Sequence, residues 1–259
     1  MSNYWAKRQA KIQEELNDKT IKETEKQLIK YYGAAARRVI KDFEATYNKL
    51  LATVGEGKEP TPADLYKLDK YWAMQAQLRQ ELNKLAEKEV ALLTKNFELH
   101  FFEVYYSLGI EGATAFSTIN NDLVHQLISS AWCLDGKNFS QRIWEHTERL
   151  TQTLNDNLVH CVAAGKKPTE LIRLLEERFE VSHSQAKTLV RTEVAHIQTE
   201  AAKKRYSDYG IKFVEFSAIH DSRTCEQCKA LDGKIYPVNA APILPVHPNG
   251  RCDILPVIE

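Results

Sequence analysis

The chain has 259 residues, 43% of them hydrophobic, and its 35 Lys and Arg residues balance its 35 Asp and Glu residues. This apolar content can bury a core, and a formal charge of zero excludes a global positive field that would hold nucleic acid or an anionic membrane. No apolar run approaches the roughly 20 residues of a membrane span and residues 1–10 lack a signal-peptide stretch, so we expect a protein made in the cytosol.

Apolar residues at helical spacing predict a long helical region at the start of the chain. Trp5, Ile12 and Leu16 fall on one face of an opening helix, and Thr20 with Glu23 forms a capping box that begins a second helix or bends the first. The apolar stripe then continues at steps of three and four through Leu28, Tyr32, Ala35, Val39, Phe43, Tyr47 and Leu50.

A loop at 54–60 precedes a second long helix. Thr61, Pro62 and Asp64 mark its start, because a capping threonine, a first-turn proline and an early carboxylate suit a helix N-terminus. The helix is expected to run as far as Ser107, with a stripe of Leu68, Tyr71, Met74, Leu78, Leu82 and Leu85. Long helices joined by a short loop pack antiparallel, so residues 1–112 are predicted to form a helical hairpin or arm.

Residues 113–209 are predicted to form a helical bundle. Helices are expected over 114–132, 139–164 and 168–179, with a turn at Asp135-Gly136 and a stop at Gly165. Ser182 and Gln185 then form a capping box for a further helix that ends near Gly210.

The pattern changes from helix to strand at Gly210. Ile211, Phe213, Phe216 and Ala218 predict a β-rich run, and 234–238 and 253–258 are two more short candidate strands. A sheet of this size buries little surface and usually needs a metal or another staple. We therefore predict a small domain over residues 210–259.

Three of the five cysteines lie within this last segment, which indicates a metal site rather than a disulfide framework. Cys225 and Cys228 form a C-x-x-C motif, and His247 with Cys252 supplies a second pair of ligands. Zn²⁺ prefers tetrahedral thiolate and imidazole ligation, and a closed Cys₃His set leaves no open position for catalysis. The sequence thus predicts a structural zinc site made of Cys225, Cys228, His247 and Cys252.

Alternatives stay open for this cluster. His220, five residues before Cys225, could replace His247, although the turn at Pro248 and Gly250 favours His247. The cysteines could also form a small core without metal. Cys133 and Cys161 are expected to pack as small hydrophobic residues.

No catalytic motif is present elsewhere. The chain has no P-loop, H-E-x-x-H, G-x-S-x-G or G-x-G-x-x-G sequence, so no catalytic residue is assigned. Arg191 and Glu193 are expected to dock one element on another, and Asp221 and Arg223 to brace the turn beside the C-x-x-C motif.

Several short motifs in the second half of the chain belong together as a set. They are Trp132, Asp135-Gly136-Lys137, Phe139-Ser140-Gln141-Arg142-Ile143-Trp144, Arg191-Thr192-Glu193, Asp221-Ser222-Arg223-Thr224-Cys225, Gly233-Lys234-Ile235-Tyr236 and His247-Pro248-Asn249-Gly250-Arg251-Cys252. In this set the chain resembles the phage head morphogenesis or minor capsid proteins related to the Mu F protein. Members of that family often have a cysteine where this chain has Gly250.

The resemblance implies a virion protein of the phage head, made in the host bacterial cytoplasm, present in few copies and not an enzyme. It implies association with the portal protein and contact with the major capsid or scaffolding protein, with roles in head assembly and in DNA packaging or ejection. Local contact with phage DNA would accompany these roles, and no membrane partner is expected.

Our interpretation is a mainly α minor capsid protein that ends in a small zinc-stabilised α+β domain. An alternative is a zinc-dependent nucleic-acid-binding module, supported by the C-x-x-C motif and by Lys203-Lys204-Arg205. Residues 182–259 hold ten basic and nine acidic residues, a poor electrostatic footprint for DNA. A third alternative is a metalloenzyme with Glu193 or Asp221 as base.

Overall fold

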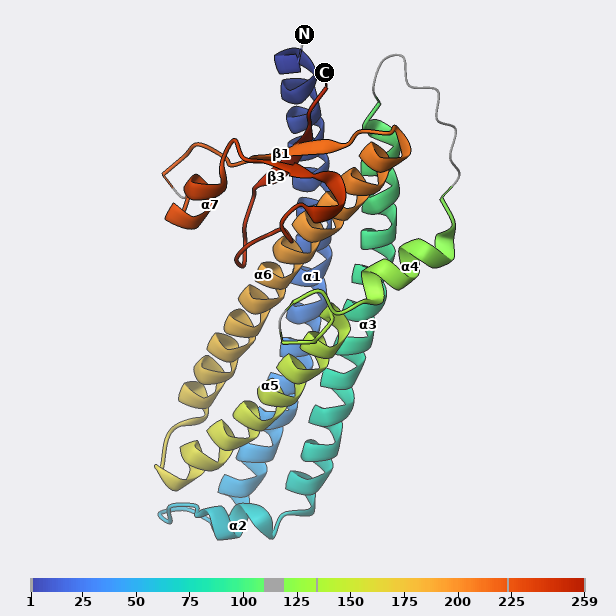
Figure 1. Ribbon diagram of the computed structural model, residues 1–259. Coiled ribbons are helices and arrows are strands. Elements are labelled where there is room, and N and C mark those ends of the chain that lie inside the picture. Colours follow the sequence, from blue (N-terminus) through green and yellow to red (C-terminus); the bar gives the residue numbers. More distant parts are fainter. Residues whose placement is uncertain (1, 110–118, 134, 223, 259) are drawn as a thin grey trace. The chain divides into compact units, whose positions relative to one another are not determined.

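The computed structural model describes residues 2–109, 119–133, 135–222 and 224–258 (Figure 1). Its helices are α1 (Ser2–Val54), α2 (Pro62–Tyr66), α3 (Asp69–Ser107), α4 (Asn121–Ser129), α5 (Phe139–Ala163), α6 (Pro168–Asp208) and α7 (Glu226–Leu231), with a 3₁₀ turn at Val238–Ala240. Its strands are β1 (Phe213–Ser217), β2 (Ile235–Pro237) and β3 (Asp253–Pro256). The predicted mainly α chain with a small C-terminal sheet is confirmed.

The chain divides into two compact units that are not consecutive in sequence. A terminal unit comprises 1–25, 92–139 and 187–259, and a bundle unit comprises 26–91 and 140–186. This division differs from the expected segments 1–112, 113–209 and 210–259, because α1, α3 and α6 each supply residues to both units.

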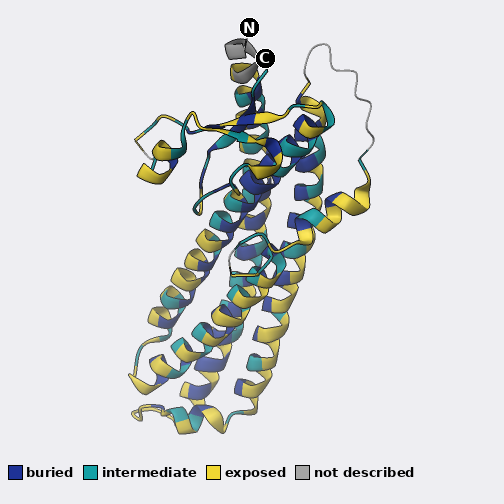
Figure 2. Cartoon of the chain, in the orientation of Figure 1, coloured by how far each residue is buried: buried dark blue, intermediate teal, exposed yellow. Residues whose placement is uncertain are grey.

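In the bundle unit, α1 and α3 run antiparallel, as the hairpin prediction requires. Tyr32 of α1 donates to Glu89 of α3 at 3.0 Å, and Arg38 of α1 contacts Glu81 of α3 at 2.9 Å. Later residues of α1 thus meet earlier residues of α3, as in an antiparallel pair. The buried residues of these helices (Figure 2) are mostly apolar. Their buried residues include the predicted stripe of α1 from Leu28 to Leu50 and, in α5 and α6, Ile143, Leu150, Leu154, Leu158, Leu171, Leu175 and Phe179.

In the terminal unit, the first half of α1 contacts the second half of α3. The same unit contains the three-stranded sheet. Lys19 contacts Glu103 at 2.7 Å, and Arg205 of α6 donates to the Leu108 carbonyl at 3.2 Å. The sheet has the order β2-β1-β3, with both pairings antiparallel. Strand prediction over 234–238 and 253–258 is confirmed by β2 and β3.

The helix start predicted at Ser182 is wrong, and at Thr20 the chain continues the first helix instead of beginning a second one. α1 passes through Thr20 without a break, and the Thr20 hydroxyl lies 3.0 Å from Nδ1 of His100. α6 passes through Ser182 in the same way, and the Ser182 hydroxyl hydrogen-bonds to Tyr32. Interior serine and threonine side chains found partners on neighbouring helices instead of capping their own.

The start of α1 is buried on a polar face. Gln9 and Gln13 are 0% exposed, whereas Ile12 and Leu16 of the predicted stripe are only half-buried. Gln9 donates to the Gly109 carbonyl at 3.0 Å and Gln13 to the Ile254 carbonyl at 3.4 Å, so glutamines join this face to the residues that follow α3 and to β3. The side chain of Trp5 lies outside the described residues.

Three smaller predictions differ in extent. The capping box at Thr61 is present but begins the short α2, and α3 starts separately at Asp69. The helix expected over 114–132 is α4, Asn121–Ser129, and residues 110–118 and 134 lie outside the described part. Cys161 is fully buried as predicted, whereas Cys133 is half-buried. None of the described helices combines the length and apolarity needed to cross a membrane.

Candidate metal centre

The C-x-x-C motif forms the first turn of α7. Cys225 is the N-cap of this helix, and its sulfur accepts a hydrogen bond from the backbone N–H of Cys228 at 3.4 Å. This hydrogen bond lowers the pKa of the Cys225 thiol, whereas burial raises the pKa of Cys228. The turn therefore presents two sulfurs to one side, and the half-buried Cys225 is the one disposed to ionise first.

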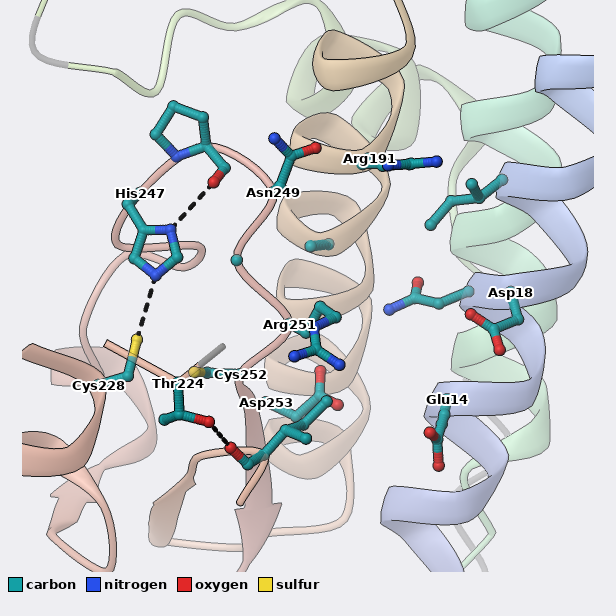
Figure 3. A pocket seen from close by; sticks show the side chains of 16 residues that line it. Glu14, Asp18, Arg191, Thr224, Cys228, His247, Asn249, Arg251, Cys252 and Asp253 are labelled. Carbon is teal, nitrogen blue, oxygen red and sulfur yellow. Dashed lines mark hydrogen bonds between the residues drawn. The ribbon is translucent and has the colours of Figure 1, made fainter. Parts of the chain in front are cut away.

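His247 completes a three-residue cluster with these cysteines, and Figure 3 shows its contact with Cys228. Its Nε2 lies 3.4 Å from Sγ of Cys228, and the ligand atoms of Cys225, Cys228 and His247 all lie within 4.8 Å of one another. Nδ1 of His247 lies 3.0 Å from the Pro248 carbonyl, which can only accept. Nδ1 is therefore the protonated nitrogen, and Nε2 presents its lone pair to the sulfurs as a metal ligand would.

The spacing of these atoms fits a shared Zn²⁺ ion. Zinc–sulfur distances of about 2.3 Å and zinc–nitrogen distances of about 2.0 Å at a tetrahedral angle place the two ligand atoms roughly 3.5 Å apart. The observed 3.4 Å between Cys228 and His247 agrees with that separation. Thiolate and imidazole donors are also the ligand types that zinc prefers.

The other two candidates lie differently. Cys252 is buried but stands outside the set of three, and burial raises the pKa of its thiol. His220 points away, with its side chain 78% exposed and Nε2 3.2 Å from Asp232. The structure thus brings His247, and not His220, to the cysteines.

Segment 241–252, which carries His247, is attached to α6 by hydrogen bonds to Thr192 and His196. The Leu244 carbonyl lies 2.8 Å from Nδ1 of His196, and the N–H of Asn249 donates to the Thr192 hydroxyl at 3.1 Å. Trp132 stacks on His196 with ring centroids 4.1 Å apart and donates to Glu193 at 2.9 Å. His196 was not singled out from the sequence, although it lies one helical turn after Thr192 on the same face.

The predicted docking roles of Arg191 and Glu193 are seen directly. Arg191 contacts Glu25 of α1 at 2.8 Å, and Glu193 accepts from Trp132. Asp221 contacts Arg251 at 2.6 Å, which braces the turn before Cys225, while Arg223 lies outside the described residues. Both acids, Glu193 and Asp221, are therefore engaged in contacts that attach one element to another.

Gly250 is fixed by its surroundings. A Cβ atom at this position would lie 2.7 Å from Cβ of Pro245 and 3.0 Å from the His247 carbonyl. A cysteine here, as in many members of the family named above, would require a different path for the 245–250 loop. In this chain, Gly250 packs closely against Pro245 and has no side chain that could bind a metal.

The basic run at 203–205 is engaged within α6 and with α3. Lys203 contacts Glu200 at 2.8 Å, Lys204 contacts Asp208 at 2.5 Å, and Arg205 is buried against the Leu108 carbonyl. A phosphate would have to displace these partners. The run does not form a ready nucleic-acid surface.

Two known sequences or families are similar to parts of this chain. The chain is 28% identical over 146 residues to a protein of Enterococcus faecalis named NAD(+)–arginine ADP-ribosyltransferase EFV, a match that covers 54% of this chain. The chain spans only 30% of that relative's length, so the transferase activity in its name is not assigned here. No solved structure is significantly similar to the chain.

A family model described as "Phage Mu protein F like protein" matches residues 152–255. The matched region runs from α5 through the docking motif of α6 to β3 and includes Cys225, Cys228, His247 and Cys252. The resemblance predicted from the short motifs is confirmed by this match: over residues 152–255 the chain is similar to the Phage Mu protein F-like family.

Proposed function

We propose that this protein is a minor head protein of a tailed phage that acts in head morphogenesis, is associated with the portal and resides in the virion. The observation that carries the proposal is the family match over 152–255, which points to phage head morphogenesis and to a structural rather than an enzymatic role. Contact with the major capsid or scaffolding protein, a part in DNA packaging or ejection, and local contact with phage DNA belong to the same proposal.

The long antiparallel helices support a role in spanning and contacting partners. Such helices present extended solvent-facing surfaces while their inward faces form a core. Exposed aromatic residues at one end of the bundle unit, Trp72 at 59% and Tyr66 at 44%, are of the type enriched at protein interfaces. These surfaces are where we expect the portal to be contacted.

We further propose that Cys225, Cys228, His247 and Cys252 hold a structural zinc ion. When bound, the ion would cross-link the start of α7 to segment 241–252, which is otherwise attached to α6 through Leu244 and Asn249. Small domains of this size often depend on such a link for stability. Cys252 would complete the set by moving to the metal.

A stop codon early in the gene of the source phage or prophage tests the head role. We expect a loss of DNA-filled heads by electron microscopy and a fall of at least 100-fold in infectious titre, both restored when the wild-type chain is supplied in trans. Normal titre and normal filled heads without the protein would overturn the proposal.

A further inference from the structure

The inward face of α1 changes from polar to apolar between Thr24 and Leu28. Over residues 7–25 every buried side chain is polar, and the four lie on one face of the helix: Gln9, Gln13, Thr20 and Thr24. From Leu28 to Leu50 the same face is apolar. The change falls close to residue 25, where α1 leaves the terminal unit and enters the bundle unit.

The two buried glutamines each make one hydrogen bond and leave one atom without a partner. Gln9 donates to the Gly109 carbonyl at 3.0 Å, and Gln13 donates to the Ile254 carbonyl at 3.4 Å. Their Oε1 atoms meet no donor among the described residues. A buried acceptor without a donor costs about as much free energy as one hydrogen bond supplies, so these side chains stabilise the contact little.

The next turns of this face repeat the pattern. Nδ1 of His100 lies 3.0 Å from the Thr20 hydroxyl, and Asn96 donates to the Thr24 hydroxyl at 2.8 Å. Nε2 of the fully buried His100 and Oδ1 of Asn17 have no hydrogen-bond partner in the described part of the chain. A partly satisfied polar network specifies how α1 lies against α3 but adds little stability.

Apolar and ionic contacts do not compensate for this. Ile12, Leu16 and Ile21 are only half-buried. The ion pair of Lys19 with Glu103, at 2.7 Å, has side chains that are 49% and 38% exposed, and exposed pairs contribute little. By contrast, every residue of the apolar stripe that follows is buried, so hydrophobic stabilisation holds the later part of α1 in the bundle unit.

We propose that residues 7–24 of α1 form a releasable strap, which leaves the rest of the terminal unit as one segment while residues 28–54 stay packed. The ion pairs of Glu25 with Arg191 at 2.8 Å and Lys187 at 3.7 Å anchor its end. Opening lets water reach the unpaired polar atoms and uncovers the Ile254 carbonyl on β3, an edge strand of the sheet. This device does not depend on the proposed head function.

Hydrogen exchange of the full chain under native conditions, followed by NMR or mass spectrometry, tests the strap. We expect the amides of 7–24 to exchange at least 100-fold faster than those of 28–50, with similar protection along the whole strap and one step between Thr24 and Leu28. Simple fraying would instead give protection that rises gradually from turn to turn. A gradual rise, or equal protection of 7–24 and 28–50, would overturn the proposal.

A variant with Gln9→Met and Asn17→Leu should hold the strap closed. Both changes keep the approximate shape of the side chain and remove an unpaired acceptor, so exchange of 7–24 should slow at least tenfold. The matched control carries Lys11→Met and Glu23→Leu at exposed positions of the same helix, and its exchange should stay within about threefold of the wild type.

Far-UV circular dichroism checks that both variants are folded. Slowing in both variants would reflect helix propensity, and slowing in neither would mean that the unpaired acceptors do not weaken the contact; either result would contradict the strap. The wild-type exchange profile is a separate test, so it still decides the proposal if a variant fails to fold.

Discussion

The imidazole Nε2 of His247 lies 3.4 Å from the sulfur of Cys228, although 18 residues separate the two in the chain. Nothing local forces this approach. It results from two separate attachments, the capping of α7 by Cys225 and the docking of segment 241–252 on α6. A metal at this point would add a link between the start of α7 and segment 241–252, which the ion pair of Arg251 with Asp221 already joins.

Replacement of His247 by alanine should lower zinc affinity at least 100-fold, because it removes one ligand of the cluster. Affinity is measured by competition with a chromophoric chelator. His220→Ala is the matched control, since that side chain is 78% exposed and faces Asp232, and it should bind zinc as the wild type does. Equal loss in both variants would mean that His247 is not a specific ligand.

Cobalt substitution tests the position of Cys252. If Cys252 completes the set, Cys252→Ser should reduce the intensity of the sulfur-to-cobalt charge-transfer band by about a third, since two thiolates remain of three. An unchanged band would restrict the site to Cys225, Cys228 and His247, the three that lie together without metal.

The stability of the bundle unit should fall as pH rises, because of Glu89. This carboxyl is 3% exposed, burial raises its pKa to about 7, and Tyr32 donates to it. A folded-state pKa above the unfolded value of 4.5 means that the protonated form stabilises the fold. That contribution is complete below pH 4.5 and is lost as pH rises to about 7, a change of about 3 kcal/mol.

Glu89→Gln keeps a neutral side chain at all pH values and should remove this dependence. Chemical denaturation at pH 5 and pH 8 measures the difference, and we expect the variant to be the more stable protein at pH 8. Exposed Glu87, two residues away, provides the control through Glu87→Gln. If Glu89→Gln and wild type lose stability equally between the two pH values, Glu89 is not the group responsible.

The contact between Trp132 and Glu193 should contribute measurably to stability. Glu193 is 3% exposed, and Trp132→Phe removes a hydrogen-bond donor from a buried carboxyl, at a cost of about 1–3 kcal/mol. Trp144→Phe is the comparison, since Trp144 is 40% exposed, and it should cost less than about 1 kcal/mol. Similar losses for both would show that the contact with Glu193 contributes little.

Substitution of Gly250 by alanine should destabilise the loop that carries His247. The added Cβ would lie 2.7 Å from Pro245, and such overpacking costs about 1–3 kcal/mol. At Gly109 an added Cβ would meet nothing within 4 Å, so Gly109→Ala should be close to neutral. Hydrogen exchange of residues 241–252 would rise in Gly250→Ala alone; unchanged exchange would contradict the packing argument.

Much of the fold could be predicted from local patterns. Apolar periodicity located the core stripe from Leu28 to Leu50, and the change of period at Gly210 located β1. Capping signals were less reliable, because a hydroxyl such as that of Thr20 or Ser182 can serve either its own helix or a neighbour. Only the tertiary structure decides between these uses.

The candidate site was predictable in its ligand types and only partly in its assembly. The spacing of Cys225 and Cys228 within one helical turn indicated a shared site, and the turn at Gly250 favoured His247. No local pattern showed that Trp132, Thr192 and His196 attach this loop to α6, or that the buried face of α1 is made of Gln9 and Gln13. Those contacts join residues far apart in sequence, so they depend on the packing of whole elements.

Quantitative mass spectrometry of gradient-purified procapsids and mature particles from the source phage or induced prophage tests the central claim most directly. The minor head assignment predicts a few copies of this chain per particle, co-sedimenting with the portal protein. Its absence from both kinds of particle would contradict the assignment.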